Sequence, residues 1–272
     1  MMSCYFTVND NFEGIIKKHL TNIESISLVE TGWTNFVYKV RSNNVSYVFR
    51  FPRNTFFSNV LNKEVTFSKF IKGKLSYNTT DLNLLYDNER PFTMHVEIPG
   101  NNMTEMYPSL TIEDKRRIAN QVSNFIYELQ NIDTSTLDID LNTTSDFLIG
   151  LSKVDDQEYD LTKLNPLKEL EKKKLTLSHA DLNPGNILLD ENKNVCGILD
   201  FAFVSYTSDL NDMARLIGRL PSDYYSIMLE EYNKRFNINV TKEEVDEIIS
   251  VWNHVEHHYM IYMRNHHPEI KF

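Results

Sequence analysis

The apolar residues of the first 97 positions fall into short runs, bounded by polar or turn-forming residues, of the kind that form strands. Runs at 26–30 and 36–40 flank Thr31-Gly-Trp-Thr-Asn35, whose single glycine suits a hairpin, and a third run at 45–51 ends at Pro52. Two more runs lie at 82–85 and 92–98, and apolar spacing indicates a helix over 62–72. The pattern predicts five strands and one helix, ending at Glu97-Ile-Pro-Gly100, where Pro and Gly interrupt an extended segment.

Beyond residue 98 the apolar positions recur at helical spacing instead. One long amphipathic helix is expected after Thr111, which stands at capping-box spacing from Asp114. Its apolar positions are Ile118, Val122, Phe125, Ile126 and Leu129. Further helices are predicted over 161–174, 210–218, 222–236 and 242–265, the last opening with a second capping box at Thr241 and Glu244. The chain is therefore expected to be α+β, with a strand-rich part at 1–97 and a mainly helical part at 98–272.

One segment between the predicted helices holds an ordered set of polar residues, Leu177-Ser-His-Ala-Asp-Leu-Asn-Pro-Gly-Asn-Ile-Leu-Leu-Asp190. Asp181 lies two residues after His179, and Asn186 lies five residues after Asp181. Apolar runs at 187–189 and 195–199 flank a polar turn and lead to Asp200, which Phe201 follows. H-x-D-x-x-x-x-N, then a hairpin, then D-F is the catalytic-loop pattern of kinases.

Phosphoryl transfer from a nucleotide needs the chemical groups that this segment supplies. Asp181 is the candidate catalytic residue, orienting the acceptor hydroxyl and accepting its proton. Asn186 and Asp200 are candidate Mg²⁺ ligands, because Mg²⁺ prefers hard oxygen donors, and Asp200 would connect the ion to the β- and γ-phosphates. The segment predicts a magnesium-dependent kinase.

The wording of the motif resembles a family of small-molecule kinases. His-x-Asp-x-x-Pro-Gly-Asn-Ile-Leu is similar to the aminoglycoside phosphotransferase and choline kinase group, and the pattern as a whole is closest to the 2''-aminoglycoside phosphotransferases. The resemblance implies a bilobal protein-kinase-like fold, with a five-stranded antiparallel sheet and one helix in the first lobe. It also implies structural roles for His179, which would brace the loop, and for Asp212 in Ser208-Asp-Leu-Asn-Asp212, which would anchor it.

The same resemblance assigns a nucleotide-binding set to residues 1–97 and the residue that follows the boundary. Arg50 stands where kinases usually carry a lysine on the third strand, and Glu64 matches the helix glutamate that pairs with it. Arginine keeps the charge needed at the phosphates but presents it as a planar fork. The remaining members are three positions of the phosphate loop and two of the hinge that would meet the base, namely Gly32, Thr34, Asn35, Val96 and Ile98.

Candidate acceptor-binding residues come from the last predicted helix. Its apolar face carries one acid, Glu256, between Trp252 and Tyr259. A ligand ammonium would satisfy both the carboxylate and the aromatic faces, and an internal salt bridge with Arg or Lys is the alternative. Asp209 and Asp223 are further acidic candidates. Where the 2''-aminoglycoside phosphotransferases carry an acid after D-F-G, this chain has Phe203, which offers an ammonium no charge.

Charge and composition narrow the class of partner. Residues 1–97 carry 11 Lys and Arg against 9 Asp and Glu, while residues 98–272 carry 17 against 29. This imbalance suits a polyphosphate in the first part and a cationic acceptor in the second, and it argues against nucleic acid. No apolar run approaches the ~20 residues of a membrane span, and two cysteines form no disulfide framework. A monomeric cytoplasmic enzyme without membrane contact is expected.

The predicted function is transfer of the γ-phosphoryl group of ATP or GTP to a hydroxyl of a small cationic molecule, with an aminoglycoside and antibiotic resistance as the leading case. Kinases of a choline-like amino-alcohol or of a macrolide remain alternatives. A kinase-fold protein that binds without catalysis is a third possibility, although Asp181, Asn186 and Asp200 are all present. A protein kinase is disfavoured because no A-P-E segment follows Asp200-Phe201.

Overall fold

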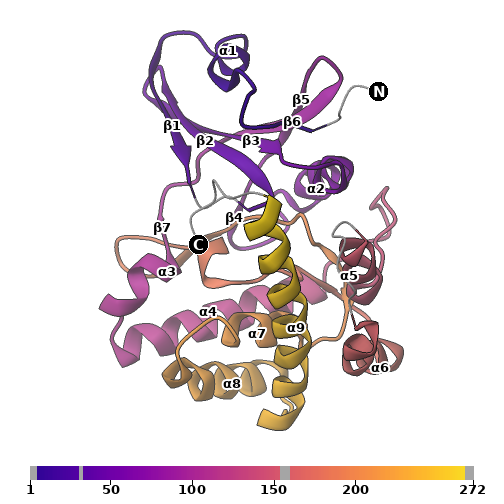
Figure 1. Cartoon of the computed structure of the whole chain (residues 1–272). Helices are drawn as coiled ribbons and strands as arrows, with labels where there is room; N and C mark the ends of the chain where they lie inside the picture. Colours follow the sequence, from indigo (N-terminus) through magenta and orange to yellow (C-terminus); the bar gives the residue numbers. More distant parts are fainter. Residues whose placement is uncertain (1–4, 31–32, 154–159, 267–272) are drawn as a thin grey trace. The chain divides into compact units, whose positions relative to one another are not determined.

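A computed structural model describes residues 5–30, 33–153 and 160–266 (Figure 1). These residues divide into two compact units. The first contains the described residues of Met1–Phe70, Thr80–Glu97 and Met260–Phe272, and the second those of Ile71–Thr79 and Ile98–Tyr259. The boundary predicted between residues 97 and 98 coincides with one point where the chain passes from one unit to the other.

A five-stranded antiparallel sheet forms the first unit, with strand order β1-β2-β3-β6-β5. The sheet was predicted from the short apolar runs, and the prediction is confirmed. Asn43 and Asn44 have positive φ angles of 50° and 63° in the turn between β2 and β3, as tight hairpin turns require. The elements of this unit are α1 (Phe12–Ile16), β1 (Ile23–Val29), β2 (Asn35–Ser42), β3 (Val45–Pro52), α2 (Thr55–Ile71), β5 (Asn83–Asp87) and β6 (Arg90–Val96).

Side-chain alternation along β3 gives the two faces of this sheet different roles. Phe49 and Phe51 point into an aromatic core that also includes Phe92 and, from α1, Phe12. Arg50, between the two phenylalanines, contacts Glu64 of α2 on the opposite face. The sheet therefore buries hydrophobic area on one side and presents a charged pair beside a helix on the other.

The second unit is mainly helical and contains two small sheets, with strand orders β4-β10-β9-β7 and β11-β8. Three 3₁₀ turns, at Tyr107–Ser109, Leu161–Leu164 and Pro184–Asn186, join its elements. The helices are α3 (Met103–Met106), α4 (Ile112–Gln130), α5 (Thr144–Ser152), α6 (Asn165–Lys173), α7 (Asn211–Ile217), α8 (Ser222–Phe236) and α9 (Lys242–His266), the last of which ends among residues of the first unit. The strands are β4 (Asn78–Thr79), β7 (Asn101–Asn102), β8 (Thr176–Ser178), β9 (Ile187–Leu189), β10 (Val195–Ile198) and β11 (Ser205–Thr207).

Helix α4 lies at the centre of this unit. Its predicted apolar positions are all buried, and both halves of the capping box between Thr111 and Asp114 are present. Phe125 of α4 meets the ring of Phe201, which lies just beyond the catalytic hairpin β9–β10, at a centroid distance of 6.4 Å. The core of the unit thus reaches the segment in which the kinase pattern was found.

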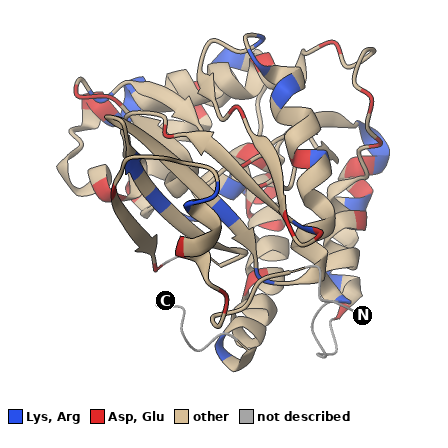
Figure 2. Ribbon diagram, turned by 90° about the horizontal axis from the view of Figure 1, so that it is seen from above, with Lys and Arg blue, Asp and Glu red and all other residues tan. Residues whose placement is uncertain are grey.

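Charged residues of both signs are interspersed along the chain (Figure 2). Several acidic residues of the second unit are paired within it: Asp114 with Arg117 and Lys193, and Glu230 and Glu231 with Arg116. Part of the excess of acidic residues in the second unit therefore forms salt bridges within that unit. Among the described residues, no helix combines the length and the apolar character that crossing a membrane would need.

Candidate active site

His179 joins the two ends of the catalytic hairpin. Its side chain is buried, its Nε2 lies 2.8 Å from the carbonyl oxygen of Leu199, and its Nδ1 accepts a hydrogen bond from the backbone N–H of Asp181 at 3.3 Å. Because Nδ1 accepts this bond, Nε2 is assigned as the ring nitrogen that donates to Leu199. The ring also packs against Phe201 at a centroid distance of 4.5 Å. These contacts hold Asp181 relative to the residue that precedes Asp200.

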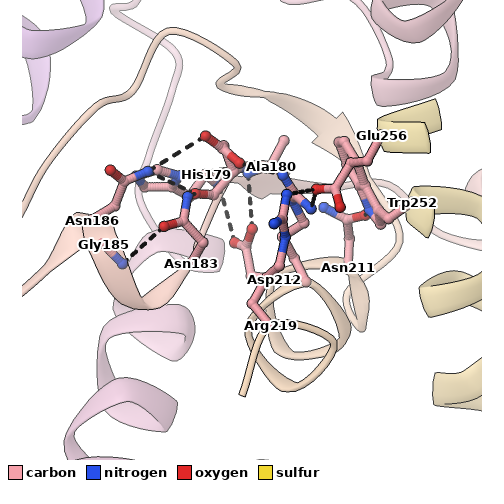
Figure 3. Close-up of polar contacts among 12 residues, drawn as sticks. His179, Ala180, Asn183, Gly185, Asn186, Asn211, Asp212, Arg219, Trp252 and Glu256 are labelled. Atoms are coloured by element: carbon pink, nitrogen blue, oxygen red, sulfur yellow. Dashed lines mark hydrogen bonds and ion pairs between the residues drawn. The ribbon is translucent and has the colours of Figure 1, made fainter. Parts of the chain in front are cut away.

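Asp212 fastens the start of the same loop from helix α7. Its carboxylate accepts hydrogen bonds from the backbone N–H groups of His179 (2.9 Å) and Ala180 (2.8 Å) (Figure 3). It also accepts one from the hydroxyl of Ser178 (2.6 Å). Burial raises the pKa of Asp212, although these donors and nearby His179 oppose the shift. Ala180 has a positive φ of 61°, a conformation that costs a non-glycine residue energy and that the hydrogen bonds here offset.

The side chain of Asn186 is oriented by its own loop. Its Nδ2 donates to the backbone carbonyl of Asp181 at 2.9 Å, and its backbone carbonyl accepts from the N–H of Leu199 at 2.9 Å. The amide oxygen is the end of the side chain left for a ligand. Asp200, half-buried with a positive φ of 63°, follows the strand that pairs with this loop. An amide oxygen and a carboxylate are hard donors, so these two residues fit Mg²⁺.

In the first unit the predicted ion pair is present. Arg50 Nη1 lies 2.5 Å from Glu64 Oε1, and both side chains are buried. Burial lowers the pKa of neighbouring Lys63 to about 8, although the Glu64 charge opposes the shift. The pair holds a guanidinium on β3, as the resemblance to kinases implied.

The other nucleotide-binding candidates form no comparable charged pair among the described residues. Asn35 is buried and donates from Nδ2 to the hydroxyl of Thr34 at 2.8 Å, while Gly32 lies outside the described residues. Val96, at the end of β6, is 56% exposed. Ile98 is half-buried and begins the second unit, where its side chain lies beside Gly197. Their roles at a nucleotide stay predictions.

Each of the three acidic acceptor candidates has a cationic partner within the second unit. Asp209 pairs with Lys174 at 3.1 Å, and Asp223 pairs with Lys115 at 2.5 Å and also accepts from the hydroxyl of Tyr107. Glu256 accepts hydrogen bonds from both Arg215 and Arg219. The internal salt bridge considered from the sequence is therefore present at Glu256, because two arginines of the segment around α7 face helix α9 there.

The aromatic candidates on α9 are also engaged. The guanidinium of Arg215 lies 4.3 Å from the ring centroid of Trp252, and Trp252 Nε1 donates to Asn211 Oδ1 at 3.0 Å (Figure 3). Tyr259 is buried. Phe203, the residue that departs from the family pattern, packs on Phe147 at a centroid distance of 4.5 Å. The face of Trp252 that was predicted to bind a ligand ammonium is thus in contact with the guanidinium of Arg215.

Comparisons with known proteins identify the family of this chain. A model of the phosphotransferase enzyme family, APH, matches residues 25–247. The chain belongs to this phosphotransferase family. A solved structure described as the GDP and kanamycin complex of APH(2")-IIia is similar to it, with 19% identity, a TM-score of 0.71, and coverage of 95% of this chain and 94% of the other.

Two further solved structures share the fold of this phosphotransferase. A streptomycin–ATP–APH(2")-IIa ternary complex gives 20% identity and a TM-score of 0.62, covering 94% of this chain and 91% of the other. The macrolide 2'-phosphotransferase MphH from Brachybacterium faecium gives 13% identity and a TM-score of 0.62, covering 94% and 93%. At these identities the likeness establishes the kinase-like fold, which confirms the predicted fold class.

Some residues of the candidate site were missed from the sequence. Arg215 bonds directly to Asp181, with Nη2 2.7 Å from Oδ1. Asn183 caps the 3₁₀ turn by accepting from the N–H of Gly185 at 2.9 Å and donates to the carbonyl of Asp181 at 3.1 Å. An asparagine directly before Pro-Gly was a local signal for such a turn. For Arg215 the signal was weaker: a lone arginine within a short apolar helix.

Proposed function

We propose that this chain transfers the γ-phosphoryl group of ATP or GTP to a hydroxyl of a small molecule, with Asp181 as the catalytic residue. The observation that carries the proposal is the shared anchoring of the catalytic loop. His179 ties Asp181 to the residue before Asp200, and Asn186 is bonded to the backbone of Asp181. Family membership and the nucleotides named for its structural relatives, GDP and ATP, support a nucleotide donor.

The residues divide the reaction between them. Asp181 would accept a hydrogen bond from the acceptor hydroxyl, orient its oxygen, and take its proton as the new O–P bond forms. Asn186 and Asp200 would hold Mg²⁺, which neutralises charge on the phosphates when bound. Arg50, fixed by Glu64, would contact the phosphates as a cation. We assign nucleotide binding to residues 1–97 and acceptor binding to residues 98–272.

An aminoglycoside is the leading acceptor. Kanamycin and streptomycin are named with the structural relatives, and the aminoglycoside phosphotransferase pattern runs through the catalytic segment of this chain. Antibiotic resistance would be the physiological role. The enzyme is proposed to act as a monomer in the cytoplasm, without nucleic acid or membrane as partner.

A second candidate acceptor is a less cationic antibiotic such as a macrolide. Two observations favour it: Glu256 is neutralised by Arg215 and Arg219, and Phe203 packs on Phe147 where an acid would meet an ammonium. The pairing of Glu256 with Arg215 and Arg219 also disfavours a choline-like amino-alcohol, because no free carboxylate remains at Glu256 for its ammonium. The relatives include a macrolide phosphotransferase.

Release of nucleoside diphosphate in the presence of Mg²⁺ tests these acceptors against one another. ATP and GTP are each supplied with a panel of aminoglycosides, macrolides and choline, and Asp181→Asn serves as the control. Turnover stimulated by one class and lost in Asp181→Asn supports the proposal and identifies the acceptor class. Nucleotide binding with no stimulated turnover across the panel would favour a non-catalytic binding protein, and turnover unchanged in Asp181→Asn would refute the role of Asp181.

A further inference from the structure

The carboxylate of Asp181 has one close hydrogen-bond donor among the described residues, and that donor is Arg215. Nη2 of Arg215 lies 2.7 Å from Oδ1. The next donor, Nδ2 of Asn186, lies 3.4 Å from Oδ2 and is already bonded to the backbone carbonyl of Asp181 at 2.9 Å. The loop therefore fixes the backbone of Asp181, while the direction of its carboxylate depends on the arginine.

Arg215 is itself held on two further sides. Its side chain is 7% exposed, Nη1 donates to Glu256 of α9, and the guanidinium lies over the ring of Trp252. Trp252 is in turn bonded to Asn211, one residue before Asp212. A planar guanidinium presents donors in fixed directions, so bonding both carboxylates sets its orientation.

Glu256 completes an alternating series of charges that runs Asp181, Arg215, Glu256, Arg219. The four formal charges cancel, and each carboxylate lies beside a guanidinium. Figure 3 shows Glu256 and Trp252 reaching from helix α9 toward the loop that carries His179 and Asn186. The contacts describe Glu256 as the residue that holds Arg215 in place.

We propose that Arg215 is a positioning residue for phosphoryl transfer: it pins Oδ1 of Asp181 and leaves Oδ2 to face the acceptor hydroxyl. This inference rests on the proposed catalytic role of Asp181. In the step it serves, the acceptor O–H bond breaks and its proton passes to Oδ2. The acceptor oxygen bonds to the γ-phosphorus, and the bond from that phosphorus to the β–γ bridging oxygen breaks to release the nucleoside diphosphate.

Arginine suits this task better than lysine. A guanidinium has N–H donors and no acceptor atom, so it cannot compete with Asp181 for the proton of the acceptor hydroxyl. Its second N–H edge reaches Glu256 while the first holds Asp181, which a single ammonium on a flexible stem does less well. Arg215→Lys should therefore restore part of what Arg215→Met loses.

The test measures kcat and KM for nucleotide and acceptor in Arg215→Met, Arg215→Lys and Glu256→Gln. We expect kcat to fall about 10- to 100-fold in Arg215→Met and less in Arg215→Lys, with KM for the nucleotide unchanged. A fourth variant, Arg215→Ala, tests chemical rescue: added guanidinium ion should recover part of its kcat, which a general loss of folding would not allow. The matched control is Arg116→Met, which removes an arginine paired with Glu230 and Glu231 and should leave kcat unchanged.

Glu256→Gln separates positioning from substrate binding at this residue. If Glu256 holds Arg215, kcat falls for every acceptor. If Glu256 binds a ligand ammonium, KM rises for cationic acceptors alone while kcat stays the same, and that result overturns the assignment.

A kcat within twofold of the wild-type value in both Arg215→Met and Arg215→Lys would overturn the inference, provided that Asp181→Asn is inactive. Activity retained in Asp181→Asn would instead refute the proposed function itself. Should Arg215→Met fail to fold, Arg215→Lys and Glu256→Gln decide the question by the same criteria.

Discussion

Glu64→Gln removes one partner of a buried ion pair in the first unit, and its cost can be worked from the geometry. The side chains of Arg50 and Glu64 are 9% and 1% exposed, with 2.5 Å between Nη1 and Oε1. Water cannot replace the lost carboxylate at such a site, so the free energy of unfolding should fall by about 3–5 kcal/mol. For a chain of this size that corresponds to a Tm lowered by about 10 °C.

The double variant Arg50→Met with Glu64→Leu separates stability from function. Replacing both charges by apolar side chains of similar size removes the buried charge, so stability should return to within about 1 kcal/mol of the wild type. Nucleotide affinity should stay low, because the cation proposed to contact the phosphates is absent. Urea unfolding gives the first quantity, and titration with nucleotide and Mg²⁺ gives the second.

The matched control is the Lys39–Glu97 pair of the same unit, with side chains 54% and 31% exposed at 2.6 Å. Glu97→Gln should cost less than about 1 kcal/mol, because water screens exposed pairs. The reasoning is refuted if Glu64→Gln costs no more than Glu97→Gln, or if the double variant is as unstable as the sum of its two single changes.

Three further outcomes follow from the site and the fold. Asn186→Ala should raise the Mg²⁺ concentration for half-maximal activity about 10- to 100-fold. Asn186→Asp keeps an oxygen ligand and should raise that concentration less. Equal Mg²⁺ dependence in the wild type and both variants would contradict the ligand assignment. Thr111→Val should lower the free energy of unfolding by about 1 kcal/mol in urea, because it deletes the hydroxyl that caps α4, and no loss would refute the capping role. Hydrogen bonds from Lys193 and Thr111 hold the pKa of Asp114 below its ordinary value, so its contribution is present above the unfolded pKa near 4 and is lost as pH falls through the folded pKa. Asp114→Asn should therefore flatten the decline of Tm below about pH 5, and an unchanged decline would contradict the assignment.

Local patterns were the part of this molecule that the sequence could predict. Helix α8 begins and ends at the predicted residues 222 and 236, and both capping boxes at 111 and 241 are present. Helical period and cap chemistry depend on neighbours within one turn, so they can be read from the chain directly. The order of Asp181, Asn186 and Asp200 around a hairpin is local in the same way.

Elements that depend on distant partners were missed or misplaced. Strands β8 and β11 have three residues each and pair with one another, and helix α5 is short, so none carries a readable period. Helix α2 begins at Thr55 rather than at residue 62, about two turns earlier, because the side chain of Asn54 accepts from the N–H of Phe57 and caps the helix there. A short first helix, α1, was likewise not predicted.

The acceptor side shows the same limit in the site itself. The wheel of α9 placed Trp252, Glu256 and Tyr259 on one face, but the two partners of Glu256, Arg215 and Arg219, lie 41 and 37 residues away in sequence. Periodicity states which side of a helix is buried and cannot state what covers it. The contact of Arg215 with Glu256 therefore depends on the packing of α7 against α9, which the sequence pattern does not specify.

The central claim is that Asp181 drives transfer of a phosphoryl group to a small hydroxylated acceptor. Mass spectrometry of the acceptor after incubation with nucleotide and Mg²⁺ tests it most directly. The wild type and Asp181→Asn are compared at the same protein concentration, after thermal unfolding has shown that their Tm values agree. The account predicts an acceptor that gains one phosphoryl group with the wild type, at a rate at least ~100-fold lower with Asp181→Asn. Equal formation of phosphorylated acceptor by the two proteins would contradict it.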